Sequence, residues 1–273
     1  MFASGWIAAL VALFAWWFST GAILALVRFA DRRGPRANTA AVLWTLPLLA
    51  AGLWGYHATL GGAGPAAVYG AFLSALAIWG WVELAFLTGR ITGPAARPCP
   101  PGVGEGERFL RAWGTVAYHE MLLAGLLIAM ALTGWGAENL FGLWTFAVLF
   151  AARISAKLNL FYGVPKINLE FIPDALAHLP SHFRTGRLNR LFPLSVSALT
   201  AATACWVERL ISADTTAATV GFALLTALTA LALLEHWLMV IPWQDAKLWR
   251  WMLPERRRAP KTTTYGPEDA HGL

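Results

Sequence analysis

The fold class is decided by AAVYGAFLSALAIWGWVELAFLT, residues 66–88, in which Glu83 is the one charged side chain. At about 1.5 Å per residue, a helix of this length crosses the roughly 30 Å hydrocarbon core of a bilayer. The stretch ends just before Arg90. The sequence therefore predicts a transmembrane helix here.

Six further stretches share this length and apolar character. Together they predict seven spans, at residues 2–27, 40–60, 66–88, 109–133, 139–162, 191–211 and 217–241. The composition agrees, because 58% of the residues are hydrophobic and 13% charged, against about 25% charged in soluble proteins. A soluble enzyme is excluded, and we expect an all-α, polytopic helical membrane protein.

The basic residues are distributed unevenly between these stretches. All 21 Lys and Arg residues except Arg209 lie in or beside the first, third and fifth gaps, at the end of the fifth span, or in the tail. Basic loops stay on the cytoplasmic side of a membrane. We therefore expect a periplasmic N-terminus and a cytoplasmic C-terminus, and the net charge of +6 reflects these loops rather than nucleic-acid binding.

We expect one helical membrane domain over residues 1–253 and a mobile cytoplasmic tail over residues 254–273, which is polar and basic. The longest connection, residues 163–190, is too polar to span and too apolar for a free linker. It is expected to lie against the cytoplasmic face of the membrane. Pro173 and Pro180 predict a short interfacial helix that begins near the first and ends before the second.

Several ionisable residues lie inside the predicted spans, where a charge costs about 2.5–3.5 kcal/mol. They are Glu83, His119, Glu120, Glu235 and His236. Their depths, roughly 10–15 Å from the basic boundary, are similar on three different helices. Arg153 and Lys157, spaced i and i+4, share a helix face near the same depth and are suited to neutralise these carboxylates.

Three interpretations of this polar cluster stay open. The favoured one is buried ion pairs of the carboxylates with Arg153, Lys157 or Arg111. In the second, the cluster is a metal site in which Glu and His side chains bind iron or manganese. Its candidate ligands are Glu83, His119, Glu120, Glu235 and His236.

The spacing counts against the metal site, because adjacent residues point about 100° apart on a helix and no Glu-x-x-His occurs. In the third interpretation, His119 or His236 is an axial ligand of a tetrapyrrole. No catalytic residue is assigned. Second-tier candidates are Asn159, Glu170, Asp174 and His178.

Long strings of the chain form a further pattern. They include WGWVELAFLTGRITGP (79–94), YHE (118–120), GLWTFAVLFAARISAKLNLFYGVPKINLEFIPD (142–174), LFPLSVS (191–197) and LEHWLMVIPWQDAKLWRW (234–251). They resemble the PuhE family of photosynthetic-complex assembly proteins of purple phototrophic bacteria. The similarity covers nearly the whole chain except the first dozen residues and the tail.

The resemblance implies a multi-pass protein of the bacterial inner membrane, cytoplasmic or intracytoplasmic. We expect an assembly factor for the photosynthetic reaction centre and its light-harvesting complex, which handles bacteriochlorophyll or holds a nascent subunit. Expected partners are the lipid bilayer and reaction-centre, light-harvesting or pigment-biosynthesis proteins, without nucleic acid. Bacteriochlorophyll or a precursor stands beside iron and manganese as a candidate cofactor. The alternative is a membrane-embedded, metal-dependent enzyme that acts on a pigment precursor or lipid through the Glu/His cluster.

Overall fold

The computed structural model describes residues 4–241, and within that range it contains helices and no strands. The long helices are α1 (Gly5–Asp31), α2 (Pro35–Trp44), α3 (Leu46–Thr59), α4 (Pro65–Leu87), α5 (Glu105–Thr133), α6 (Phe141–Tyr162), α7 (Leu191–Ile211) and α8 (Thr216–Leu238). Among the described residues, seven helical units are long and apolar enough to cross a membrane, with α2 and α3 forming one unit. The predicted all-α fold with seven spans is confirmed. The predicted tail, residues 254–273, lies outside the described residues.

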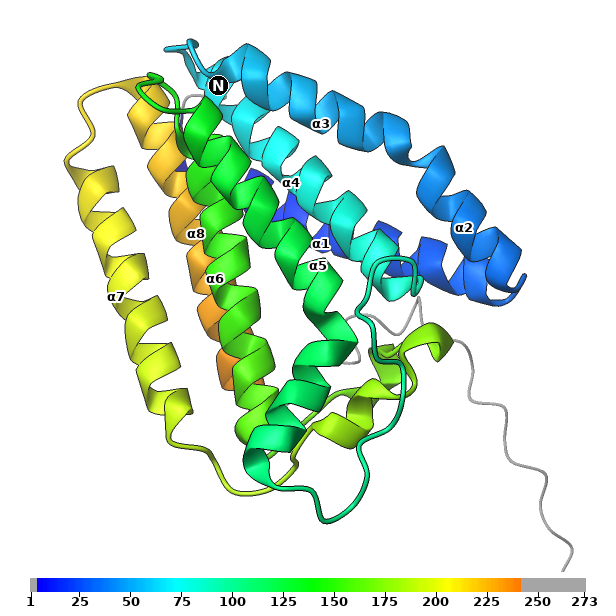
Figure 1. Ribbon diagram of the computed structural model, residues 1–273. Helices are drawn as coiled ribbons and strands as arrows, with labels where there is room; N and C mark the ends of the chain where they lie inside the picture. Colours follow the sequence, from blue (N-terminus) through cyan, green and yellow to red (C-terminus); the bar gives the residue numbers. More distant parts are fainter. Residues whose placement is uncertain (1–3, 242–273) are drawn as a thin grey trace, which may run out of the picture.

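The second span is interrupted where α2 ends and α3 begins. Pro47 stands in the first turn of α3, and Pro has no backbone N–H to continue the ladder of the preceding helix. The hydroxyl of Thr45 instead donates to the carbonyls of Ala41 and Val42, at 2.8 and 3.1 Å. The span is therefore bent, as Figure 1 shows on the outer side of the bundle.

Helix α4 lies at the centre of the bundle, where it contacts α1, α3, α6 and α8 (Figure 1). Small side chains permit the close approach: a Cβ on Gly52 of α3 would lie 2.9 Å from Ile78 of α4. Large apolar side chains, among them Phe14 and Trp54, are exposed on the outer helices. An apolar exterior of this kind is suited to contact with lipid.

The basic gaps meet at one end of the bundle. The Arg90 guanidinium, after α4, donates to the carbonyl of Pro35 at 3.0 Å, and the backbone N–H of Cys99 donates to Ser181 Oγ at 2.9 Å. These contacts join the first, third and fifth gaps. The gaps after α3, α5 and α7 lie at the opposite end (Figure 1).

The connection over residues 163–190 closes this basic end. It contains three short 3-10 turns, η1 (Leu169–Phe171), η2 (Asp174–Leu176) and η3 (Leu179–His182), rather than the single helix expected between Pro173 and Pro180. Leu176 and Leu179 are buried against Phe86 at the end of α4. Burial of these two side chains attaches the connection to the bundle.

Helix α4 ends in a Schellman motif. Gly89 has φ +72°, and the N–H groups of Gly89 and Arg90 donate to the carbonyls of Phe86 and Ala85, at 2.9 and 2.8 Å. These bonds satisfy carbonyls that the helix end would leave unpaired. The chain is thereby turned back towards α5.

The loop after this turn is bound directly to the backbone of α5. The N–H of His119 donates to the carbonyl of Thr92, and the N–H of Ala95 donates to the carbonyl of Gly114, each at 2.9 Å. Gly93 lies between these bonds, where an added Cβ would stand 2.2 Å from the Gly114 oxygen. The loop therefore fixes the part of α5 that carries His119.

We expect Gly93→Ala to lower the free energy of unfolding by about 1–3 kcal/mol, because the added methyl collides with the α5 backbone. Gly106→Ala is the control, since a Cβ at this helical position meets nothing within 4 Å. Thermal unfolding of the purified chain in a mild detergent measures both variants. Equal stability of the two variants would show that the loop does not require a glycine at residue 93.

Candidate functional site

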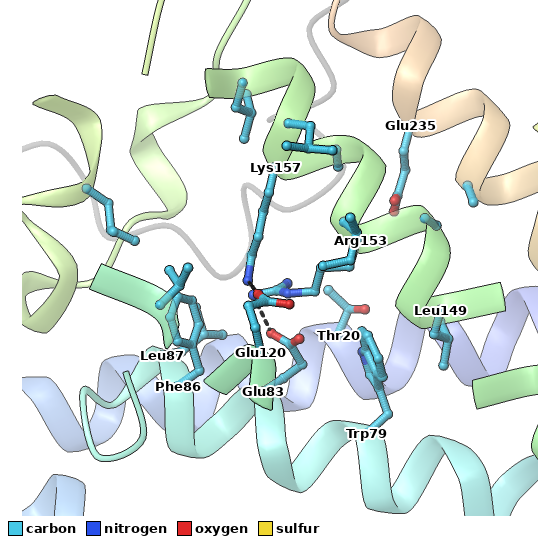
Figure 2. Close-up of a pocket in the computed structure, with 18 of the residues that line it drawn as sticks. Thr20, Trp79, Glu83, Phe86, Leu87, Glu120, Leu149, Arg153, Lys157 and Glu235 are labelled. Atoms are coloured by element: carbon cyan, nitrogen blue, oxygen red, sulfur yellow. Dashed lines mark hydrogen bonds and ion pairs between the residues drawn. The ribbon is translucent and has the colours of Figure 1, made fainter. Parts of the chain in front are cut away.

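A cavity of about 650 Å³ lies between α1, α4, α5, α6, α8 and η3. Its volume falls within the roughly 300–1,000 Å³ of small-molecule sites. Its walls are mostly apolar, and include Trp16, Trp79 and Leu228. Five ionisable side chains of the spans also line it, namely Glu83, Glu120, Arg153, Lys157 and Glu235 (Figure 2).

Two buried ion pairs join three helices at this cavity. Arg153 Nη2 of α6 lies 2.9 Å from Glu83 Oε2 of α4, and Lys157 of α6 forms an ion pair with Glu120 of α5. Glu83 and Glu120 are only 7% and 3% exposed, so an unpaired charge on either would be costly. The structure therefore agrees with the interpretation in which Arg153 and Lys157 form buried ion pairs with the carboxylates.

Arg111 does not pair with a carboxylate of the cavity. It pairs with Glu107 on the exposed surface of α5, at 2.6 Å. Residues 107 and 111 are spaced i and i+4, and this local partner lies outside the cavity.

His119 lies beside the two pairs without bonding to them. Its ring packs against Phe86 with 4.3 Å between centroids, and it is fully buried. His119 Nε2 is 3.7 Å from Glu83 Oε1 and 3.9 Å from Glu120 Oε1, beyond hydrogen-bond length. Neither ring nitrogen has a hydrogen-bond partner.

Glu235 and His236 face different surroundings, as expected for adjacent helical residues. Glu235 lines the cavity, and part of its surface is also exposed. His236 is buried away from the cavity lining, with Nδ1 2.8 Å from the Ala232 carbonyl and Nε2 2.8 Å from Ser155 Oγ. Since a carbonyl can only accept, Nδ1 donates and Nε2 accepts from the serine hydroxyl.

Asn159 lies about one turn after Ser155 on the same face of α6, which differs from the face that carries Arg153 and Lys157. Its Nδ2 donates to the Ser155 carbonyl and to Ser195 Oγ of α7, both at 2.9 Å, and it accepts from Asn189 Nδ2 at 3.1 Å. Asn159 is fully buried. These bonds join α6 to the beginning of α7, so the contacts of Asn159 are those of a helix-packing residue.

The remaining second-tier candidates lie outside the cavity lining. Glu170 and Asp174 are exposed on η1 and η2, and His178 is half-buried just before η3. These three residues are spaced four apart, and they would share a face only on a continuous helix, which this connection does not form. The structure therefore does not bring them to the polar cluster.

Two residues of the basic end were missed as candidates. His182 is buried and lines the cavity, and burial lowers its pKa, which keeps the imidazole neutral at pH 7. Arg108 is 6% exposed and donates to the carbonyls of His182 and Phe161, at 2.9 and 2.7 Å. Arg108 carries no signal in the sequence beyond its place at a basic boundary, since both acceptors are backbone atoms.

The five candidate metal ligands are not gathered at one point. Glu83 and Glu120 are each held by a cation, and His236 faces Ser155. Within residues 4–241, no group of three or more His, Cys, Asp or Glu side chains is placed to hold a metal ion. The donor set therefore does not fit the iron or manganese centre.

We expect Lys157→Met to lower the free energy of unfolding by about 3–5 kcal/mol, because it leaves the Glu120 carboxylate buried without its cation. The double variant Glu120→Gln with Lys157→Met should be more stable than Lys157→Met alone. Unfolding of the purified chain in detergent micelles measures each difference.

The exposed Glu107–Arg111 pair supplies the control for this measurement. Glu107→Gln should change the stability by less than about 1 kcal/mol, because solvent screens the pair. If Lys157→Met cost no more than Glu107→Gln, the buried pairs would not hold α5 to α6.

Comparisons with known proteins give the following relatives. A family model described as "Protein of unknown function (DUF3623)" matches residues 2–260. The "Uncharacterized 30.4 kDa protein in puhA 5'region" of Rhodobacter capsulatus is 55% identical over 252 residues, which cover 91% of each chain. No solved structure matches the chain.

Proposed function

Because this chain belongs to the DUF3623 family, we propose that it is an integral membrane assembly factor for the photosynthetic reaction centre and its light-harvesting complex. The name of the Rhodobacter capsulatus relative, which refers to the puhA 5' region, supports this context. So does the resemblance to PuhE proteins. The observation that carries the proposal is the intramembrane cavity with its buried charge pairs.

The cavity is suited to holding a client in the membrane. Its apolar walls bury an apolar body, and the polar side chains on one region of the wall orient the client. A bacteriochlorophyll, a pigment precursor or an apolar segment of a nascent subunit meets these requirements. The exposed apolar faces of the outer helices offer surfaces for reaction-centre or light-harvesting subunits.

This geometry favours holding a client over the alternative of a metal-dependent enzyme. A carboxylate that is already paired with Arg153 or Lys157 must lose that partner before it binds a metal ion. In a buried site this exchange carries the cost of separating an ion pair.

We also propose that the basic end of the bundle faces the cytoplasm of a bacterial inner membrane. Fourteen of the 21 Lys and Arg residues lie in or beside its gaps, whereas Arg209 alone lies beside a gap of the opposite end, and the basic gaps contact one another. Residues 1–253 then act as one membrane domain, with a cytoplasmic tail after it.

Reporter fusions test this orientation. Alkaline phosphatase fused after Gly136 should be active, because this gap is predicted to be periplasmic, and the same fusion after Gly102 should be inactive. A fusion after Gly61 is the control and should behave as the one after Gly136. The reverse pattern would show that the basic end faces the periplasm.

Filling the cavity should impair assembly. We expect Ala156→Trp to reduce the reaction-centre and light-harvesting absorbance of a deletion strain carrying this variant, because Ala156 lines the cavity and a Trp there excludes the client. Ala51→Trp is the control, since Ala51 is exposed on α3 and does not line the cavity. Near-infrared spectra of membranes measure the complexes at matched levels of each variant.

Co-purification completes the experiment. The tagged chain should bring down reaction-centre, light-harvesting or pigment-biosynthesis proteins from phototrophic membranes. Normal levels of the complexes in the deletion strain, together with recovery of none of these proteins, would contradict the assembly role.

A further inference from the structure

Acids outnumber bases at the cavity wall. Glu83, Glu120 and Glu235 line it together with two Lys or Arg side chains, those of Arg153 and Lys157. Each of the two bases already has a carboxylate partner. Glu235 has no hydrogen bond or ion pair with any other residue in 4–241. Within residues 4–241, Glu235 is therefore the acid of this wall that forms no ion pair of its own.

Unfilled hydrogen-bond acceptors also exceed unfilled donors. Glu83 Oε1 and Glu120 Oε2 are buried and have no hydrogen-bond partner, although both side chains line the cavity. The unfilled donor on the same wall is Arg153 Nε. Buried polar atoms are normally paired, so this surplus indicates a ligand that brings donors.

An anionic head group does not suit this wall. It would have to displace Glu83 or Glu120 from its cation, or enter beside a third carboxylate. Separating a buried ion pair is costly, and like charges repel in a medium of low dielectric constant. A cationic head group does not have to displace a carboxylate from its cation, and it is attracted rather than repelled by Glu235.

The apolar walls of the cavity indicate the nature of the rest of the ligand. Trp16 of α1, Trp79 of α4 and Leu228 of α8 line the wall, and Figure 2 shows Trp79 on the same side as Glu83. Indole rings bury apolar groups and also attract ammonium groups through their faces. The walls thus suit a hydrocarbon body next to a positive charge.

We propose that the cavity binds an amphipathic molecule with one protonated amine, which pairs with Glu235 beside the buried carboxylates of Glu83 and Glu120. The hydrocarbon body of the ligand lies against the aromatic and aliphatic walls. This inference rests on the proposed function and narrows it, because a bacteriochlorophyll carries no amine and is then not the client of this cavity.

A matched series of probes tests the head group. The purified full-length chain in a neutral maltoside detergent is titrated with dodecylamine, dodecanol and dodecanoate below their micellar concentrations. Native mass spectrometry counts the bound probe, and the rise in Tm reports binding to the folded state. We expect dodecylamine to bind about tenfold or more tightly than either of the other probes.

The variant Glu235→Gln should abolish this preference for the amine and leave dodecanol binding unchanged, since it removes the charge and keeps the shape. Glu208→Gln is the control, because Glu208 is exposed on α7 and pairs with Arg209. Equal binding of the three probes, a preference for dodecanoate, or an unchanged amine preference in Glu235→Gln would overturn the proposal.

Two sources of the amine are separated by competition. If phosphatidylethanolamine displaces dodecylamine and phosphatidylcholine does not, the amine is that of a lipid headgroup; if neither does, it belongs to a free amphiphile. Both results support the proposal. Its failure is distinct from failure of the assembly role, because the binding titration does not depend on complex levels in the membrane.

Discussion

The two buried ion pairs are the constraint on which the rest of the structure depends. Glu83–Arg153 and Glu120–Lys157 join α4, α5 and α6 within an apolar surrounding. A charge left alone there is costly, so none of the three helices can rotate or slide without separating a pair. The pairs thereby hold the charged wall of the cavity in one arrangement, and the apolar walls are built around it.

Helix α6 serves both this wall and a separate packing contact. Arg153 and Lys157 lie one turn apart on one face, whereas Ser155 and Asn159 lie roughly 200° around the helix. The first face binds the carboxylates of α4 and α5, and the second binds His236 and the start of α7. One helix therefore positions the site and also fixes the outer pair of helices.

A cavity held by paired charges suits a protein that keeps a client in the bilayer. Both partners of each pair belong to the protein itself, so the pairs restrict these side chains and limit the conformational freedom lost on binding. Glu235 lines the same cavity and forms no ion pair within residues 4–241. The proposed preference for a cationic ligand depends on this difference between the two paired acids and Glu235.

The sequence by itself determined the seven spans, the clustering of the basic gaps and the depth of Glu83, Glu120 and Glu235, because hydropathy, charge and helical rise act along the chain. Only the tertiary structure decided which side chains meet. His236 turned towards Ser155, Arg111 took a local partner, and Arg108 bound backbone carbonyls of distant segments. These outcomes depend on how each helix is rotated about its axis, which packing between helices sets and a single sequence does not show.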